Sequence, residues 1–392
     1  MARAQGACRE AEGMIYLDNA ATSFPKPPEV IEAVRDAMEN IGGNPGRGGH
    51  DGALAGAKLM EECREEAADL LGAEKPEQVI FCLNCTDALN TAIRGTLHEG
   101  DEVLVSHGEH NAVMRPLMGY HDAGKITVRI LPPDERGLLQ PDTVRRAISG
   151  KTALCILCHA SNVTGVIQPA RGIAAACHSL GVPLLLDAAQ TAGTEDVAAV
   201  GADMIALPGH KGLMGPMGTG LLCLNHGMLP RPLREGGTGS MSESLRQPAI
   251  LPDRLESGTV NLPGIAGLKA GIAFVRRHRE AIREYEQALT NRLRAGLKSI
   301  PGVTVYGAED APRASAVSFN VGEKESGETA DALNRLGFAL RGGLHCAPSI
   351  HAWLGTTQIG AVRASAGPFS TDQEIDRLLD AVEKIAKEKP FD

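Results

Sequence analysis

Two side chains near the middle of this 392-residue chain could act on a carbonyl compound. Lys211 lies in the glycine-rich segment GHKGLMGPMGTG (209–220), directly after a short apolar run. A lysine in a partly desolvated site has a lowered pKa and can form a Schiff base. Asp187 ends the apolar run LLLD, where a buried carboxylate needs a partner such as a protonated ring nitrogen. The simpler alternatives are a solvated loop lysine and an aspartate bonded to loop amides.

Two further segments could bind an anion and supply a nucleophile. Thr86 lies where FCLNCTDALN (81–90) passes from a strand into a helix, and helix N-terminal amides bind phosphate, although a simple N-cap has the same pattern. Cys346 lies in the loop RGGLHCAP, where an accessible thiol can ionise, whereas a core cysteine is inert. Arg363 could hold a carboxylate through two parallel hydrogen bonds.

Alternating strands and helices must position these residues. Short apolar runs predict strands at 78–82, 102–106, 126–131, 153–158, 183–188, 204–207 and 220–224. Apolar residues at helical spacing predict helices at 30–40, 53–73 and 170–181, and another helix starting at Thr86. This alternation predicts an α/β fold whose mostly parallel sheet is covered by helices on both faces.

The pattern changes near residue 263. Residues 264–299 predict a long helical stretch with breaks, followed by strands at 303–307, 315–321 and 338–342 and a last helix at 371–389, which Ser370 or Thr371 could cap. We therefore expect a large domain at 14–262 that begins with an arm (14–28), and a smaller C-terminal α+β domain at 263–392. Residues 1–13 are interpreted as an extension.

Composition excludes several classes of function. The net charge is −9 and basic residues are scattered, which argues against nucleic-acid and membrane-surface binding. No apolar run is long enough for a membrane span or a signal peptide. Nine cysteines without a framework pattern favour free thiols in a reducing cytoplasm. The pairs Cys82/Cys85 and Cys155/Cys158 have a zinc-like spacing, but each lies at a strand and its adjoining loop, so we expect no metal site.

Taken together, the motifs resemble the cysteine desulfurase / selenocysteine lyase family of class V aminotransferase-fold enzymes. The matching segments are YLDNAAT (16–22), NPGRGGH (44–50), NCTDALN (84–90), EHNAV (109–113), SNVTG (161–165), DAAQ (187–190), GHKGLMGPMGTG (209–220), ESGTVNLPGIAGL (256–268), RGGLHCAP (341–348) and VRASAGPFST (362–371). The resemblance implies the fold type I of enzymes that use pyridoxal 5′-phosphate (PLP), with the catalytic cysteine loop in the C-terminal domain.

The resemblance also implies a role for particular residues. Lys211 would carry PLP covalently, Asp187 would pair with its pyridine nitrogen, and His110 would stack on its ring and assist proton transfer. The other cofactor-binding residues would be Gln190 and Asn162 near the phenolic oxygen, Cys85, Thr86 and His210 at the phosphate, and Thr259 at the phosphate of the other subunit of a homodimer. Where the family often has serine before Gly-His-Lys, this chain has Pro208, so one hydroxyl donor to the phosphate is missing.

The function implied is PLP-dependent cysteine desulfuration. Arg363, with Asn162, Arg341 and Ala21, would bind the substrate, and Cys346 would take its sulfur as a persulfide while alanine leaves. The short spacing from Cys346 to Arg363 resembles group II desulfurases, which implies an acceptor protein and a role in iron–sulfur cluster assembly. Selenocysteine lyase, another class V lyase or aminotransferase, and a non-catalytic sulfur carrier or scaffold remain as alternatives.

Overall fold

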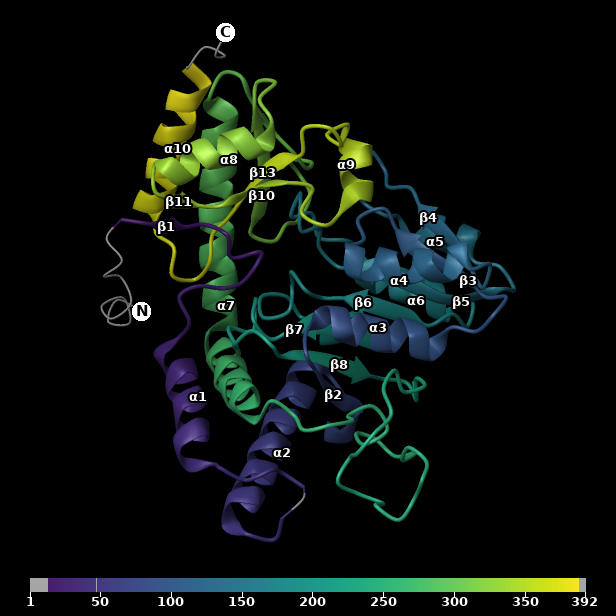
Figure 1. The fold of residues 1–392 in the computed structure, drawn as a ribbon. Helices are drawn as coiled ribbons and strands as arrows, with labels where there is room; N and C mark the ends of the chain where they lie inside the picture. Colours follow the sequence, from purple (N-terminus) through teal and green to yellow (C-terminus); the bar gives the residue numbers. More distant parts are fainter. Residues whose placement is uncertain (1–12, 47, 388–392) are drawn as a thin grey trace.

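The computed structural model describes residues 13–46 and 48–387. Within them, seven strands form a sheet in the order β2-β8-β7-β6-β5-β3-β4 (Figure 1). The strands are β2 (Val79–Cys82), β3 (Glu102–Ser106), β4 (Thr127–Leu131), β5 (Thr152–Cys158), β6 (Leu184–Asp187), β7 (Met204–Pro208) and β8 (Gly220–Leu224). β8 is antiparallel to β2 and β7, whereas the pairs from β7 to β4 are parallel. The predicted α/β class is confirmed.

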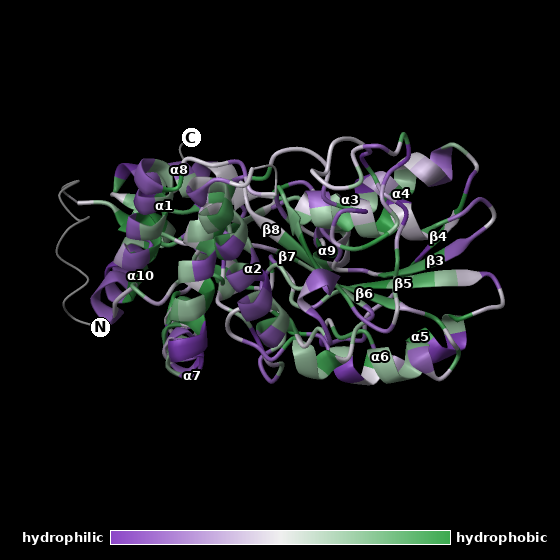
Figure 2. Cartoon of the chain, turned by 90° about the horizontal axis from the view of Figure 1, so that it is seen from below, coloured by the Kyte–Doolittle hydropathy of each residue, from purple (hydrophilic) through white to green (hydrophobic). Residues whose placement is uncertain are grey.

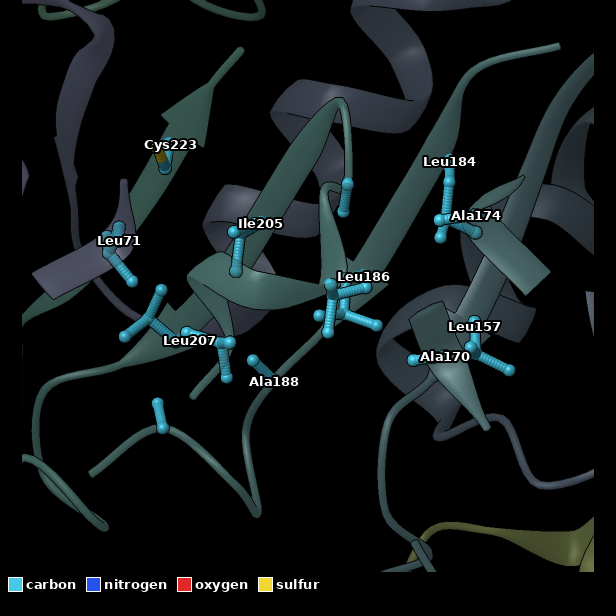
Figure 3. Close-up of a cluster of buried hydrophobic side chains, with 14 of the residues drawn as sticks. Leu71, Leu157, Ala170, Ala174, Leu184, Leu186, Ala188, Ile205, Leu207 and Cys223 are labelled. Atoms are coloured by element: carbon cyan, nitrogen blue, oxygen red, sulfur yellow. The ribbon is translucent and has the colours of Figure 1, made fainter. Parts of the chain in front are cut away.

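Helices cover both faces of this sheet, because successive strand residues point to opposite sides. Leu184 and Leu186 of β6 pack in one core with Ala174 (Figure 3), whereas Leu185 packs in the opposite core with Leu89. The first face carries α2 (Asp51–Leu71), α5 (Pro141–Ala147) and α6 (Ala170–His178), and the second carries α3 (Cys85–Thr96) and α4 (Asn111–Asp122). Figure 2 shows α3 and α4 on one side of the strands and α5 and α6 on the other.

The C-terminal elements form a second layer structure. In the described residues, an antiparallel sheet has the order β12-β13-β10-β9. Its strands are β9 (Val303–Val305), β10 (Ala316–Val321), β12 (Arg341–Gly343) and β13 (Ala361–Ser365), and its helices are α8 (Ser326–Arg335) and α10 (Asp372–Lys387). Phe319 and Leu378 are fully buried between these strands and α10. Thr371 Oγ1 accepts from the Glu374 amide, which confirms Thr371 as a cap of α10.

Helix α7 (Leu262–Ser299) corrects one prediction, because it is a single helix without the expected breaks. Pro263 lies in its first turn, where a missing N–H costs nothing. Its glycines permit close packing: a Cβ at Gly271 would lie 2.3 Å from the Leu213 carbonyl oxygen. The helix joins the two parts of the molecule (Figure 1), since Leu268 packs against the large sheet and Leu293 packs in the C-terminal core.

Two smaller predictions are also wrong. The strand expected at 338–342 is split into β11 (Phe338–Ala339) and β12, which belong to different sheets. Cys155 and Cys158 both lie inside β5, so this pair does not reach into an adjoining loop as the sequence suggested.

The N-terminal arm is part of the C-terminal core. Its strand β1 (Ile15–Tyr16) pairs in parallel with β11, and Leu17 is fully buried in that core. The arm then runs past the large sheet to α1 (Pro28–Asn40), which lies beside α7 (Figure 1). The domain boundary at 262/263 stays a prediction, and residues 1–12 of the extension lie outside the described residues. In the part described, none of the helices is long and apolar enough to cross a bilayer.

Candidate active site

A cavity of about 310 Å³ gathers almost every predicted site residue. Its lining includes Ala21, Cys85, Thr86, His110, Asn162, Asp187, Gln190, His210, Lys211, Arg341, Cys346 and Arg363. Thr259 is the exception, because it lines a separate cavity of about 70 Å³ beside Arg234. Its predicted contact with a second subunit stays a prediction.

Asp187 and Lys211 are brought together by neighbouring strands. Asp187 ends β6 and Lys211 follows β7, and these strands run in parallel, so their carboxyl ends share one edge of the sheet. Asp187 Oδ1 accepts from the Ala189 amide at 3.0 Å and lies 3.7 Å from the Cys85 thiol. Burial lowers the pKa of Lys211, while Cys85 and Asp187 oppose that shift. The Lys211 amine therefore deprotonates more easily than a solvated lysine, as a nucleophile or base requires.

The lysine loop is held by the N-terminal arm. The carbonyl oxygen of His210 accepts from the Ser23 amide at 3.0 Å and from the Thr22 hydroxyl at 3.1 Å. The Ser23 hydroxyl also reaches the Lys211 carbonyl oxygen at 3.0 Å. Gly212 is required here, because a Cβ would lie 1.9 Å from the Ala192 carbonyl oxygen. The backbone that carries Lys211 is thus fixed on both sides.

Two polar side chains of the cavity have a defined orientation. His110 is the N-cap of α4, and its Nδ1 accepts from the Ala112 amide at 3.0 Å. The neutral ring therefore carries its hydrogen on Nε2, and burial lowers the pKa of His110, which favours that neutral form. Gln190 donates from Nε2 to the Ala20 carbonyl oxygen at 3.0 Å, which fixes the Gln190 amide.

The start of α3 and the side chain of His210 line one corner of the cavity, which has the donors to bind an anion and is called the anion-binding corner. Asn84, not Thr86, is the N-cap, since its side chain accepts from the Asp87 amide. Cys85 and Thr86 are the first residues of the helix, where backbone amides lack intrahelical partners. His210 Nδ1 is buried without a hydrogen-bond partner among the described residues. Burial lowers the pKa of His210 to about 4, so a neutral ring faces this corner.

Arg363 and Arg341 share one carboxylate, that of Asp18. Arg363 Nη2 donates to Asp18 Oδ1 at 2.9 Å, and Arg341 Nε donates to Asp18 Oδ2 at 2.8 Å. Arg363 Nη1 donates to the Asn162 carbonyl oxygen at 3.0 Å. The Arg363 side chain is only 3% exposed, so it is a buried cation whose charge is partly offset by Asp18.

Cys346 lies at the accessible side of the cavity. Of the cysteines in the described part of the chain, Cys346 alone is exposed, and the others are buried or half-buried. His345 and Cys346 have φ angles of 49° and 57°, in the left-handed region that costs non-glycine residues energy. The loop is held by Asn162 Nδ2, which donates to the His345 carbonyl oxygen at 2.7 Å, and by the Asn111 amide, which donates to the Cys346 carbonyl oxygen at 2.7 Å.

This arrangement agrees with comparisons to known proteins. Residues 15–378 match the family model described as aminotransferase class-V. The chain belongs to the class V aminotransferase family. A probable cysteine desulfurase from Methanothermobacter thermautotrophicus is 33% identical over 95% of this chain and 94% of its own length. The apo structure of a cysteine desulfurase from Thermococcus onnurineus has a TM-score of 0.90 at 30% identity, covering 95% of each chain.

A second solved relative carries a modified sulfur group. It is an Escherichia coli cysteine desulfurase described with an S-sulfonic acid, with a TM-score of 0.85 at 28% identity, covering 97% of this chain and 96% of its own. The class V assignment therefore rests on family, sequence and structure together.

Sequence reasoning on this class V chain missed two buried residues at the site. Asp18 had no assigned role, although a charge inside the apolar run MIYLDNAAT was a usable signal. Glu109 is fully buried beside His110, and its Oε1 accepts from the Cys158 amide at 2.6 Å and from the Ser106 hydroxyl at 2.5 Å. Nothing in its sequence context distinguishes Glu109 from a surface glutamate.

Proposed function

We propose that this chain is a PLP-dependent cysteine desulfurase that converts L-cysteine to L-alanine and leaves the sulfur as a persulfide on Cys346. One observation carries the proposal: a single cavity contains the half-buried Lys211, the buried Asp187, the buried cation Arg363 and the exposed thiol of Cys346. Relatives about as long as this chain, at 32–33% identity, are named cysteine desulfurase or probable cysteine desulfurase. A lyase without a sulfur acceptor would not need an exposed cysteine in the same cavity as the lysine.

The residues present fit PLP. The unpartnered Nδ1 of His210 and the amides at the start of α3 supply donors for a phosphate, and Asp187 supplies an anion for a protonated ring nitrogen. A cavity of about 310 Å³ is within the size range of small-molecule sites. When bound, PLP supplies an electron sink that stabilises negative charge at the substrate Cα.

The protein groups would then share the remaining work. Arg363 binds the α-carboxylate of L-cysteine, which orients the substrate and lowers the entropic cost of reaction. The Lys211 amine accepts the proton from Cα and can return a proton at the end. The Cys346 thiolate attacks the substrate sulfur: the new S–S bond forms, the Cβ–S bond breaks, and its electron pair stays on the carbon, which is protonated to give alanine.

A homodimer and a sulfur acceptor belong to the same proposal. Thr259 lies outside the main cavity and lines a smaller one together with Leu83, whose side chain is 58% exposed. A second copy of the chain that covers this surface would bring Thr259 to the anion-binding corner of that second copy. The exposure of Cys346 supports onward transfer of its persulfide to an acceptor in the cytoplasm, as iron–sulfur cluster assembly requires.

The test is the product pair formed from L-cysteine. Purified protein with PLP and dithiothreitol should yield equal amounts of alanine and sulfide. The turnover of Cys346→Ala should be at least 100-fold lower, because removing a single catalytic group typically slows a reaction by about 10²–10⁴-fold. Cys223→Ser is the matched control, because its buried thiol lies outside the cavity beside Asn225 Oδ1 and should leave turnover unchanged. Pyruvate as product, or undiminished turnover by Cys346→Ala, would indicate a β-lyase instead.

A further inference from the structure

The Asp18 carboxylate joins two cations that come from neighbouring strands. Arg341 begins β12 and Arg363 lies in β13, and the two residues are paired across the antiparallel ladder. Asp18 comes from the N-terminal arm and accepts from Arg363 through Oδ1 and from Arg341 through Oδ2. A second contact, from Arg341 Nη2 to Asp18 Oδ2, measures 2.7 Å. One carboxylate therefore sets the direction of both guanidinium groups.

Arg363 keeps free donors in this arrangement. A guanidinium has five N–H donors, and the protein uses one on Nη2 for Asp18 and one on Nη1 for the Asn162 carbonyl oxygen. Arg363 Nε has no hydrogen-bond partner within the described residues. The Asn162 side-chain oxygen also lacks a partner there. Arg363, whose side chain is 3% exposed, lines the cavity, so its unused donors are available to a carboxylate bound there.

The charges of this group suit a substrate with one carboxylate. Two guanidinium groups and one carboxylate leave a net charge of +1, which a single α-carboxylate neutralises. A buried cation without a counterion is costly, and burial lowers the pKa of Arg363 while Asp18 opposes that shift. Asp18, only 12% exposed, therefore stabilises Arg363 in its charged form before substrate arrives.

We propose that Asp18 is a positioning residue that orients Arg363 and Arg341 for the carboxylate of an amino-acid substrate. Asp18 does not contact the reacting atoms, so its effect is on binding and not on the sulfur-transfer step. The proposal rests on the proposed function only in taking an amino acid as the substrate. The same arm also holds the lysine loop through Ser23, so one segment contacts both the arginine pair and the backbone of Lys211.

The test compares two ligands that differ by the carboxylate. L-Alanine and ethylamine are titrated calorimetrically into the PLP-loaded protein, which measures binding without turnover. Asp18→Asn keeps the shape but places an amide N–H₂ against a guanidinium donor, so one arginine is displaced. We expect a loss of at least tenfold in L-alanine affinity and a change below twofold for ethylamine. With L-cysteine, KM should rise while kcat changes less than twofold.

Two variants make the result specific to the carboxylate. Tyr16→Phe is the control, because among the described residues its hydroxyl donates to backbone oxygens alone, those of Asp18 and Thr22, and its loss should leave L-alanine affinity unchanged. Asp18→Glu keeps the charge but displaces it by one methylene, and should cost about threefold, a smaller effect than one lost charged hydrogen bond. If Asp18→Asn does not fold, the L-alanine affinity of Asp18→Glu is measured in its place.

The outcomes separate this proposal from the proposed function. Equal losses for L-alanine and ethylamine, or unchanged L-alanine affinity in Asp18→Asn and Asp18→Glu, would overturn the role of Asp18 alone. Wild-type protein that binds neither ligand would overturn the proposed function and this proposal with it. A loss confined to L-alanine supports Asp18 even if sulfide is never released from L-cysteine.

Discussion

The two halves of the cavity are built differently. The strand-end half, formed by Asp187, Lys211 and the start of α3, lies where neighbouring strands of the large sheet end, with Asp187 buried and Lys211 and Cys85 half-buried. The loop half, residues 341–348, contains an exposed cysteine and two consecutive residues with positive φ. The first half has its geometry from parallel strands, and the second from hydrogen bonds to residues far away in the sequence.

Under the proposed function, this difference would divide the work between the two halves. Groups that must hold a cofactor and tune a lysine benefit from rigid, desolvated surroundings. A thiol that must receive sulfur and pass it on needs access to solvent or to another protein. The backbone contact from the Asn111 amide to the Cys346 carbonyl oxygen links the loop half to α4, whose N-cap His110 lines the same cavity. The loop half is therefore positioned by α4 and Asn162, while Cys346 stays exposed.

The largest expected effect is on the strand-end half. Under the proposed function, Lys211→Ala would remove both the covalent link to PLP and the proton acceptor, so it should reduce every reaction of the site by about 10⁴-fold or more, near the upper limit for a general base. Cys346→Ala should abolish only the sulfur transfer and leave the lysine adduct intact. Borohydride reduction followed by mass spectrometry measures that adduct. A reducible adduct at another lysine in Lys211→Ala would contradict the assignment.

The strand-end half could be predicted from sequence because its signals are local. Asp187 and Lys211 each follow an apolar run, and parallel strands bring such ends together whatever the loops do. In the loop half, the sequence singled out Cys346 as an accessible thiol, but its sulfur-acceptor role came only from the family resemblance. Nothing in RGGLHCAP specifies left-handed backbone at His345 and Cys346. Asp18 was missed because its partners are 323 and 345 residues away, a pairing that no local pattern encodes.

The prediction of breaks in the helical stretch 264–299 is wrong for a similar reason, because the deciding contacts are not local in sequence. Glycine lowers helix propensity, but tertiary packing overrides it when the missing side chain permits close approach. At Gly267 a Cβ would lie 2.6 Å from Val34 Cγ2 and 2.9 Å from Pro216 Cδ, so the glycine is required by the neighbours of α7. Such contacts are visible only in the folded chain.

A smaller effect concerns Glu109, which lies at the junction of the halves beside His110. Burial raises the pKa of Glu109 to about 8, with the nearby charge of Asp187 acting in the same direction. Between about pH 4.5 and 8 the native chain therefore keeps a proton that the unfolded chain has lost, so the Glu109 contribution makes stability fall as pH rises. Glu109→Gln removes this contribution, because a glutamine side chain does not ionise.

Denaturant unfolding at pH 5, 6.5 and 8 measures the effect of Glu109→Gln. The free energy of unfolding of the wild type minus that of the variant should decrease steadily from pH 5 to pH 8. Glu286→Gln is a useful comparison, because burial also raises the pKa of Glu286 to about 8 but this residue lies on α7. Parallel pH profiles for wild type and Glu109→Gln would show that Glu109 is ionised in the folded protein.

The smallest expected effect is that of changing Pro208, in the strand-end half. This residue ends β7, lines the cavity, and stands where the family often has serine. Pro208→Ser adds a hydroxyl donor beside the anion-binding corner. One extra hydrogen bond contributes about 0.5–1.5 kcal/mol, so the affinity for PLP should rise by roughly 2–10-fold. Pro208→Ala is the matched control, since it makes the same change to the backbone without the hydroxyl. Equal PLP affinity in the serine and alanine variants, measured by equilibrium dialysis, would mean that the hydroxyl does not reach the phosphate and that the strand-end half already supplies all its donors.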